Sequence, residues 1–410
     1  MLKDYFEVPN KPAIKSGNVL SCDFTDHETF IPQPLDFTRG TLATYVDCNG
    51  LITEAGIDIP RIDYTTEIGK AKELQKPSLL LEPQSTNLVT YSEDYTQSSW
   101  AKLSSGTGTA PIITSNYAIS PDGTLNASRI VLDKGSGTTS SDYSAISDLI
   151  TLSGDGSFSI YLKSNTGTDY IVSQRLEDDR QQITVTKEWK RFTFSSSSLV
   201  NGTSGLWLRG GYGSDDYADL LVYGAQTENL SYATSYIPTS GSTVTRNGEI
   251  CNNAGQLGVF NDTEGVFYAE IAHLAPTASY SNQSSLSIND GTSNNRVMIF
   301  RTTSNNNLVS QLRLSGVNQA TIPYVRSIEQ STEFSKIAFK FKENDFAVYA
   351  NGSLVGTDTS GSVFSVGTLT TMSFNVGINS NVFYGKVREI KAFRRALTDS
   401  EMIELTNNIT

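Results

Sequence analysis

The sequence has few of the residues from which most metal centres and catalytic triads are built. Its 410 residues include three cysteines and two histidines. The cysteines are widely spaced and form no C-x-x-C pair: they are Cys22, Cys48 and Cys251. We therefore expect that the protein has no disulfide framework, and that it is assembled in a reducing compartment. His27 and His273 lie far apart in the sequence, which leaves little material for a general base, a serine triad or a metal centre. We expect no cofactor, and whether a loop binds calcium stays open.

Long apolar runs and clustered positive charge are also missing. No segment approaches the roughly 18–20 consecutive apolar residues of a membrane helix, and residues 1–10 carry charges and a proline where a secretory signal has an apolar stretch. We therefore expect that the protein does not insert into a membrane. We also expect that it is synthesised in the cytoplasm without a signal peptide. The formal net charge of −12 argues against a nucleic-acid partner, because phosphate binding needs clustered Lys and Arg.

Sustained helical periodicity is nearly absent, and short alternating strands take its place. The clearest example is KIAFKFKENDFAVYANGSLVG, at residues 336–356. Its apolar Ile337, Phe339 and Phe341 alternate with Lys and Ala, which predicts a strand with one buried face and one cationic face in water. The N-G dipeptide near its end favours a two-residue hairpin turn. With 32 glycines and abundant Ser, Thr and Asn for turns, the whole chain is predicted to be all-β.

We expect three regions along the chain. Residues 1–90 are rich in proline, which cannot donate to a central ladder, and predict an extended N-terminal attachment or oligomerisation region that packs onto a neighbouring domain or subunit. Residues 91–246 predict a β-sandwich of the jelly-roll type, and residues 247–410 predict a second sandwich. A T-x-x-E capping box at Thr398 and Glu401 predicts a short closing helix.

The first of two informative blocks of sequence contains R-x-x-x-A-T-Y-x-D-x-x-G, I/V-P-R-x-D and L-L-x-E-P-x-x-T-N-L, and ends in G-A-Q-x-E and T-S-Y-I-P-T. This order of motifs resembles a module of tailed-bacteriophage structural proteins, in which such motifs accompany a carbohydrate-binding-module-like sandwich. The resemblance spans roughly residues 35–246. The matching residues are Arg39, Ala43, Thr44, Tyr45, Asp47, Gly50, Pro60, Arg61, Asp63, Leu80, Glu82, Pro83, Thr86, Asn87, Leu88, Gly224 to Glu228 and Thr234 to Thr239.

The second block consists of GVFYAEI, FAVYANGSLVG and GKVREIKAFRRALTDSEMIEL, within residues 247–410. These segments resemble the concanavalin A-like lectin and laminin-G sandwich. Together the two resemblances imply a virion component, such as a tail fibre, a head fibre or another exposed appendage. Proteins of this kind are homo-oligomers, with a trimer favoured, and contact other virion proteins and host-surface polysaccharide. The resemblances carry over no catalytic residue.

Two loops have a composition suited to glycan contact. The first, residues 210–219, holds two tyrosines that could stack on a sugar and two aspartates that could accept hydroxyls or hold calcium. The second, residues 287–295, is rich in amides. The alternative for both is an ordinary turn, because Asn and Asp are the default turn residues. The candidate residues are Tyr212, Asp215, Asp216, Tyr217, Asn294 and Asn295.

The three tryptophans, Trp100, Trp189 and Trp207, all lie in residues 91–246. In the predicted strand, Trp207 lies on the face opposite to that of Leu206 and Leu208. Each tryptophan could be a surface platform, part of a core or part of a subunit interface, and core or interface is the interpretation that we favour.

A catalytic site is not visible in the sequence. The hydrolases among concanavalin A-like sandwiches carry carboxylates on one strand as E-x-D-x-x-E, and that pattern is absent. The nearest acidic cluster, residues 177–179, looks like a turn after a strand. We therefore expect a non-enzymatic virion appendage whose weak glycan sites gain avidity by repetition on an oligomer. The alternative is a decoration or connector protein that binds only other virion proteins, and a polysaccharide depolymerase is the third, least favoured hypothesis.

Overall fold

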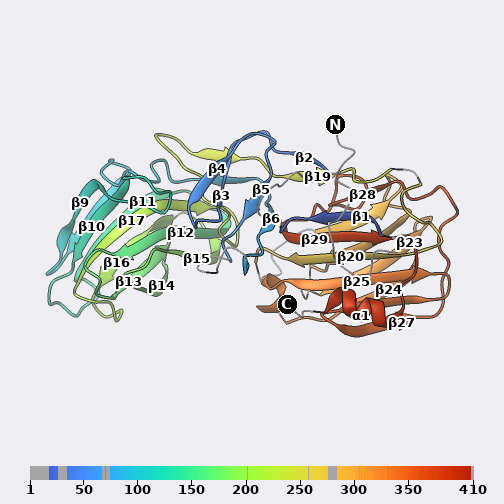
Figure 1. Ribbon diagram of the computed structural model, residues 1–410. Helices are drawn as coiled ribbons and strands as arrows, with labels where there is room; N and C mark the ends of the chain where they lie inside the picture. The colour runs from blue at the N-terminus through green and yellow to red at the C-terminus, as the bar shows by residue number, and fades with distance from the viewer. Residues whose placement is uncertain are drawn as a thin grey trace. The chain divides into compact units, whose positions relative to one another are not determined.

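The computed structural model describes residues 18–25, 35–66, 70, 74–200, 202–256, 258–275, 284–303, 305, 307–327 and 329–407 (Figure 1). Among the described residues, strands account for 52% and helix for 3%, which confirms the all-β prediction. The chain forms two compact units. The C-terminal unit consists of Met1–Gly40, Ile57–Pro83 and Gly248–Thr410, and the central unit consists of Thr41–Gly56 and Gln84–Asn247.

The central unit is a sandwich of two five-stranded antiparallel sheets, each named here after its central strand. The β17 sheet has the order β15 (Lys190–Leu199), β12 (Gly154–Ser164), β17 (Tyr217–Glu228), β10 (Ala127–Asp133), β9 (Thr109–Ala118). The β16 sheet has the order β14 (Asp179–Val185), β13 (Tyr170–Leu176), β16 (Gly202–Arg209), β11 (Tyr143–Ile150), β8 (Trp100–Ser105). Two short pairs complete the unit: β3 (Ala43–Val46) with β4 (Ile52–Ala55), and β7 (Ser85–Asn87) with β18 (Val244–Arg246).

Alternate side chains of both sheets fill the core of the central unit. Phe158 and Ile160 on β12, and Leu206 and Leu208 on β16, are each at most 1% exposed. Because successive residues of a strand point to opposite faces, the residues between them lie on the outward faces of the two sheets.

The C-terminal unit is a second sandwich. Its larger sheet has the order β27 (Ser353–Asp358), β26 (Phe346–Ala350), β25 (Ser335–Lys342), β20 (Glu264–Ala272), β29 (Gly385–Phe393), β6 (Ser78–Leu81), β5 (Arg61–Asp63), and β1 (Asn18–Asp23) also pairs with β29. The other sheet has the order β24 (Val317–Tyr324), β23 (Leu308–Leu314), β22 (Arg296–Arg301), β21 (Ser284–Asn289), β28 (Thr371–Ser373). In addition, β2 (Asp36–Thr38) pairs with β19 (Ile250–Asn252), Glu329–Thr332 forms the 3-10 helix η2, and Asp399–Thr406 forms helix α1.

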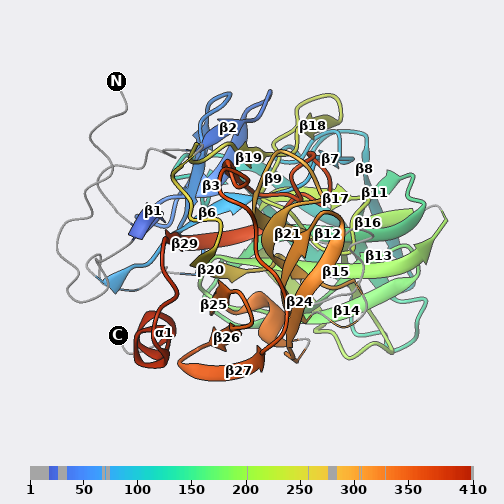
Figure 2. The ribbon, with the colours of Figure 1, turned by 90° about the vertical axis from the view of Figure 1, so that its right-hand side faces the viewer.

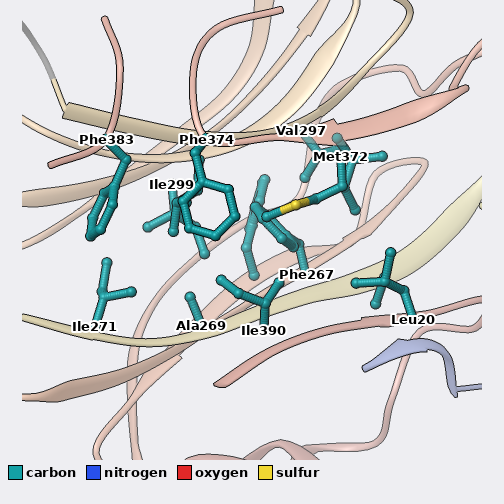
Figure 3. Close-up of a cluster of buried hydrophobic side chains, with 14 of the residues drawn as sticks. Leu20, Phe267, Ala269, Ile271, Val297, Ile299, Met372, Phe374, Phe383 and Ile390 are labelled. Atoms are coloured by element: carbon teal, nitrogen blue, oxygen red, sulfur yellow. The ribbon is translucent and has the colours of Figure 1, made fainter. Parts of the chain in front are cut away.

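Apolar side chains from both sheets of the C-terminal unit meet between the layers. Figure 3 shows them facing one another: Ala269, Ile271 and Ile390 from one sheet, and Val297, Ile299 and Met372 from the other. All six are at most 1% exposed. This buried layer is the core that the alternating pattern predicts for a sandwich.

The meander predicted at residues 336–356 is present as β25, β26 and β27. Asn351 and Gly352 connect the last two strands, and their φ angles are 48° and 81°. Two successive residues with positive φ are what a two-residue hairpin turn requires, and asparagine and glycine accept that region at least cost. The predicted capping box is also present, since the Thr398 amide donates to the Glu401 carboxylate at 2.9 Å and the Thr398 hydroxyl accepts from the Glu401 amide.

One prediction about this meander is wrong in part: Lys342 is exposed as expected, but Lys336 is half-buried and Lys340 is buried. The lysine-bearing face of β25 was expected to lie in water, but α1 packs on it (Figures 1 and 2), and Ala338 shares a buried cluster with Met402 of the helix. Lys340 is 8% exposed and its Nζ lies 2.8 Å from a carboxylate oxygen of Asp345. Lys336 donates to a backbone carbonyl just beyond the C-terminus of α1, where cations are favoured. The alternation within one strand does not reveal which distant element covers its polar face.

Residues 1–90 do not form the separate region that we expected. Within the described residues, β1, β5 and β6 complete the larger sheet of the C-terminal unit and β2 pairs with β19, whereas β3, β4 and β7 belong to the central unit. Strands this short bury too little apolar surface to be stable alone, so they add to sheets formed by later parts of the chain. Several of the prolines behind the prediction lie outside the described residues: Pro9, Pro12, Pro32 and Pro34.

Three of the phage-type motif residues form a buried charge network in the C-terminal unit. Arg39, Arg61 and Glu82 are joined by Glu249, and all four are at most 3% exposed. Glu249 accepts from Arg39 at 2.9 Å and from Arg61 at 2.8 and 2.6 Å, and Arg61 also pairs with Glu82 at 2.9 Å. The positive charges of the two guanidinium groups balance the negative charges of the two carboxylates. Charged groups can be buried together when they are paired in this way.

The later motifs hold the exit from the central sandwich. The Asn87 amide donates to the backbone carbonyl of Ile237 at 2.8 Å, and Gln226 accepts from the backbone amide of Ile237 at 2.6 Å. Glu228, which is 0% exposed, accepts from the backbone amide of Thr234 at 2.9 Å. These motif side chains bind the chain's own backbone, so they act as structural clamps.

Candidate functional site

The outward face of the β16 sheet carries a cluster of arginine and aromatic side chains. Trp207 and Arg209 alternate with the buried leucines of β16 and therefore point away from the core. The sheet pairs Trp207 with Ala145 on one side and Ser173 on the other, and it places Tyr143 opposite Arg209. We call this surface the arginine–aromatic face and define it by Tyr143, Arg175, Arg180, Trp207, Arg209 and Tyr212.

Each arginine of this face stacks on an aromatic ring. The guanidinium carbon of Arg175 lies 4.6 Å from the ring centre of Trp207, and that of Arg180 lies 4.5 Å from the ring centre of Tyr212. Arg209 lies between three rings, at 5.3 Å from Tyr212, 5.7 Å from Tyr143 and 5.8 Å from Trp207. Cation–π attraction within about 6 Å holds the guanidinium groups in place, so the face is organised before a ligand arrives.

Two hydrogen-bond donors of the face are buried and have no acceptor among the described residues. They are the indole Nε1–H of Trp207 and the Nε–H of Arg180. Trp207 as a whole is 5% exposed. A buried donor without an acceptor costs about 1–3 kcal/mol. Buried side-chain atoms without a partner also occur elsewhere in the described chain, for example at Ser157, Thr203 and Ser285, so these two donors do not by themselves mark a binding site.

Positive charge also accumulates on this face. Arg175 stands directly opposite Arg180 in the antiparallel register of β13 and β14. Burial lowers the pKa of Arg175, and repulsion by Arg180 and Arg209 adds to that effect, against the opposing influence of Asp178. Within the described chain, Asp178 is the carboxylate that pairs with this cluster, at 3.0 Å from Arg175, and its own side chain is 92% exposed.

The four candidate residues in the 210–219 loop do not converge on one site. Tyr212 is 40% exposed and belongs to the arginine–aromatic face. Asp215 accepts from the backbone amide of Ile171 at 2.8 Å, so it extends the edge of β13. Asp216 forms an ion pair with Lys134, whose side chain is 5% exposed. Tyr217 begins β17 and packs edge-on against Tyr170, with ring centres 6.4 Å apart.

The two candidate asparagines stabilise their own loop. The Asn295 side chain donates to Asp290 at 2.8 Å and accepts from the backbone amide of Ser315 at 2.7 Å. The backbone amide of Asn294 donates to the Thr292 hydroxyl at 3.1 Å, and the Asn294 side chain is exposed. This arrangement ties the 290–295 loop to the turn between β23 and β24.

The acidic cluster at residues 177–179 is the turn between β13 and β14. Glu177 has a φ of 55°, and its carboxylate accepts from the backbone amide of Val200 at 3.0 Å. Asp178 pairs with Arg175, and Asp179 accepts from the Ser196 hydroxyl. Across the described residues, no three His, Cys, Asp or Glu side chains gather where they could hold a metal ion.

The central unit also contains an apolar groove of about 350 Å³. It is lined by residues 41–44, Glu54, residues 236–238 and β18. Leu42 and Val244 are 52% and 38% exposed there. The groove offers few polar groups for orienting a ligand, and the arginine–aromatic face is the better-built candidate.

Five residues of the face were missed by the sequence reasoning: Tyr143, Arg175, Arg180 and Arg209, and Trp207 as a member of a binding surface. Strand parity already places Arg175 and Arg180 across a short turn and opposite to the core. Their proximity to Trp207 depends on the pairing of β13 with β16, which no local pattern predicts.

Comparison with known proteins bears on the C-terminal unit. The family described as the Concanavalin A-like lectin/glucanases superfamily (Laminin_G_3) matches residues 271–402. The C-terminal unit contains a concanavalin A-like lectin/glucanase domain. The resemblance drawn from the segments of residues 247–410 is thereby confirmed, and the phage-type resemblance of residues 35–246 stays a prediction. No curated protein is similar enough to this chain to count as a match.

Several solved structures are similar in fold. The CBM40 domain of the Ruminococcus gnavus IT-sialidase is 20% identical, with 38% of this chain and 94% of that chain covered and a TM-score of 0.30. Domain 4 of AbnA, a GH43 extracellular arabinanase of Geobacillus stearothermophilus solved with arabinotriose, is 13% identical, with coverages of 43% and 82% and a TM-score of 0.32. The Bacillus licheniformis β-glucanase is 14% identical, with coverages of 37% and 73% and a TM-score of 0.27.

Among the described residues, no helix is both long enough and apolar enough to cross a lipid bilayer.

Proposed function

We propose that this protein is a non-catalytic glycan-binding protein whose central unit contacts glycans through the arginine–aromatic face. The observation that carries the proposal is the cluster of three guanidinium groups stacked on aromatic rings, with Tyr212 40% exposed among them. Sugars supply hydroxyl and ring oxygens as acceptors, and their C–H faces pack on exposed aromatic rings such as Tyr212. The concanavalin A-like lectin/glucanase domain of the C-terminal unit is consistent with this role.

The biological setting that we propose is an exposed appendage of a tailed-phage virion that attaches to host-surface glycans. The motifs of residues 35–246 support it by resemblance. In that setting the protein would be a homo-oligomer, with a trimer favoured, carried on other virion proteins. Repeating a weak site on an oligomer and around a virion raises the effective concentration of the second and later sites, so a millimolar contact can give firm attachment.

The test is a glycan array probed with the assembled protein, followed by binding to whole host cells. Wild-type protein should bind a defined set of glycans, and Tyr212→Ala should reduce the signal at least severalfold. Tyr117→Ala is the matched control, because Tyr117 is 45% exposed but lies on β9 of the other sheet. Absence of binding to any glycan and to host cells at high valency would sink the proposal.

A second candidate is a virion decoration or connector protein that binds only protein partners. The observation that favours it is the edge strand β9, which exposes Ile112 at 65% and is followed by Ile119 at 55%. Long apolar edge strands pair readily with other chains. Loss of oligomer or virion assembly in Ile112→Lys, with glycan binding absent in the wild type, would favour this function.

A further inference from the structure

The charge of the arginine–aromatic face narrows the class of glycan that it can bind. Like charges directly opposite one another on neighbouring strands are destabilising, and the fold places Arg175 opposite Arg180. Arg209 adds a third guanidinium within reach of the same rings. The Asp178 side chain is 92% exposed, so its ion pair with Arg175 is weakened by water and can be displaced. A bound anion would relieve this repulsion.

The donors of the face have the geometry that a carboxylate needs. A guanidinium group presents a planar fork of N–H donors, which matches the two oxygens of a carboxylate. The half-buried side chain of Arg180 makes no hydrogen bond or ion pair with another described residue. The face therefore offers donors, and its ligand must supply acceptors and negative charge.

Resting on the proposed glycan-binding function, we infer that the arginine–aromatic face binds glycans that carry carboxylate groups, such as chains of uronic acids, with Arg180 and Arg209 as the carboxylate ligands. Tyr212 lies within cation–π distance of both arginines and is 40% exposed, so its accessible surface would contact the sugar ring. A nucleic acid fits less well, because the chain carries a net charge of −12 and the arginines form one compact cluster in place of a groove that tracks a phosphate backbone.

The experiment compares the same sugar chain with and without its charge. Tetramers of glucuronic acid and of mannuronic acid are titrated calorimetrically into the full-length protein, each before and after reduction of its carboxyl groups to alcohols. At least one acidic tetramer should bind at least tenfold more tightly than its reduced form, and the difference should shrink as salt is raised.

Variants assign the effect to the face. Arg180→Gln and Arg209→Gln should each weaken binding of the acidic tetramer about tenfold and should weaken binding of the reduced tetramer by a clearly smaller factor. Lys187→Gln is the matched control: it removes one positive charge from an exposed position beyond the opposite end of β14 and should leave both affinities unchanged. Arg180→Lys retains the charge without the fork and should recover only part of the affinity. Circular dichroism confirms that each variant is folded.

The outcomes separate this inference from the function on which it rests. Equal binding of the acidic and reduced tetramers overturns the inference and leaves glycan binding intact. Binding on the glycan array that is confined to glycans without carboxylate groups also overturns the inference alone. Binding to neither the array nor the tetramers overturns both. Tighter binding of a thymidine oligonucleotide than of the acidic tetramers overturns the inference in favour of a nucleic-acid ligand.

Discussion

Replacing Glu249 with glutamine tests the buried charge network of the C-terminal unit. Glu249 accepts from Arg39 at 2.9 Å, from Arg61 at 2.8 and 2.6 Å, and from the backbone amide of Glu82 at 2.8 Å. Glutamine keeps the volume but removes the negative charge and turns an NH₂ group toward these donors. Two buried guanidinium groups then share one carboxylate. Breaking a buried ion pair by removing one partner costs about 3–5 kcal/mol, so we expect Glu249→Gln to lower the free energy of unfolding of the C-terminal unit by that amount.

The assay uses the distribution of tryptophans between the two units. Trp100, Trp189 and Trp207 all belong to the central unit, so tryptophan fluorescence reports its unfolding, whereas far-ultraviolet circular dichroism reports the strands of both units. In a urea titration, Glu249→Gln should move the unfolding of the C-terminal unit to lower urea concentration. This change should appear in the dichroism curve and not in the fluorescence curve, because the C-terminal unit contains no tryptophan. Glu404→Gln, on the exposed side of α1, is the control and should change stability by less than about 0.5 kcal/mol. A loss below about 1 kcal/mol for Glu249→Gln would refute the reasoning.

Further predictions concern three other places in the chain. Burial raises the pKa of Asp148 to about 6, above its unfolded value near 3.9, so its ionisation costs stability as the pH rises between those values. Asp148→Asn should therefore stabilise the central unit by roughly 2–3 kcal/mol at pH 7 and by little at pH 4, as measured by fluorescence in urea; a pH-independent difference would contradict this. Burial also raises the pKa of Cys22 to about 12 and that of Cys251 well above its usual range. A thiol reagent at pH 8 should therefore modify only Cys48 in the folded protein, and it should modify all three cysteines in urea. Thr398→Ala should cost about 1 kcal/mol of stability in thermal unfolding by removing the cap of α1, whereas Thr398→Ser should cost little.

Local patterns predict the elements of this chain well because strand alternation and turn chemistry act between near neighbours. The meander at residues 336–356 and the capping box at Thr398 depend on contacts within a few residues, and both are present. What covers the outer face of β25 depends on α1, which begins more than 50 residues later. The sequence therefore predicts the hairpin and misjudges the environment of Lys340.

The candidate site shows the same division between local and long-range information. Arg175 and Arg180 face each other across a tight turn, so their proximity follows from the sequence alone. Their proximity to Trp207 requires the pairing of β13 with β16, and that of Tyr143 requires the pairing of β11 with β16. Asp215 was a reasonable loop candidate, but its carboxylate completes the edge of β13, a use that only the tertiary structure reveals.

The residues that carry the phage-type resemblance and the residues of the arginine–aromatic face are different sets. Arg39, Arg61 and Glu82 are buried in an ion network, and Asn87 binds backbone groups at the exit of the central sandwich. Each is engaged with the protein's own groups, so a family that shares these residues shares a way of building the fold. None of the six residues of the face belongs to those motifs. Ligand specificity can therefore vary between proteins that share the motifs, and it must be tested at the face itself.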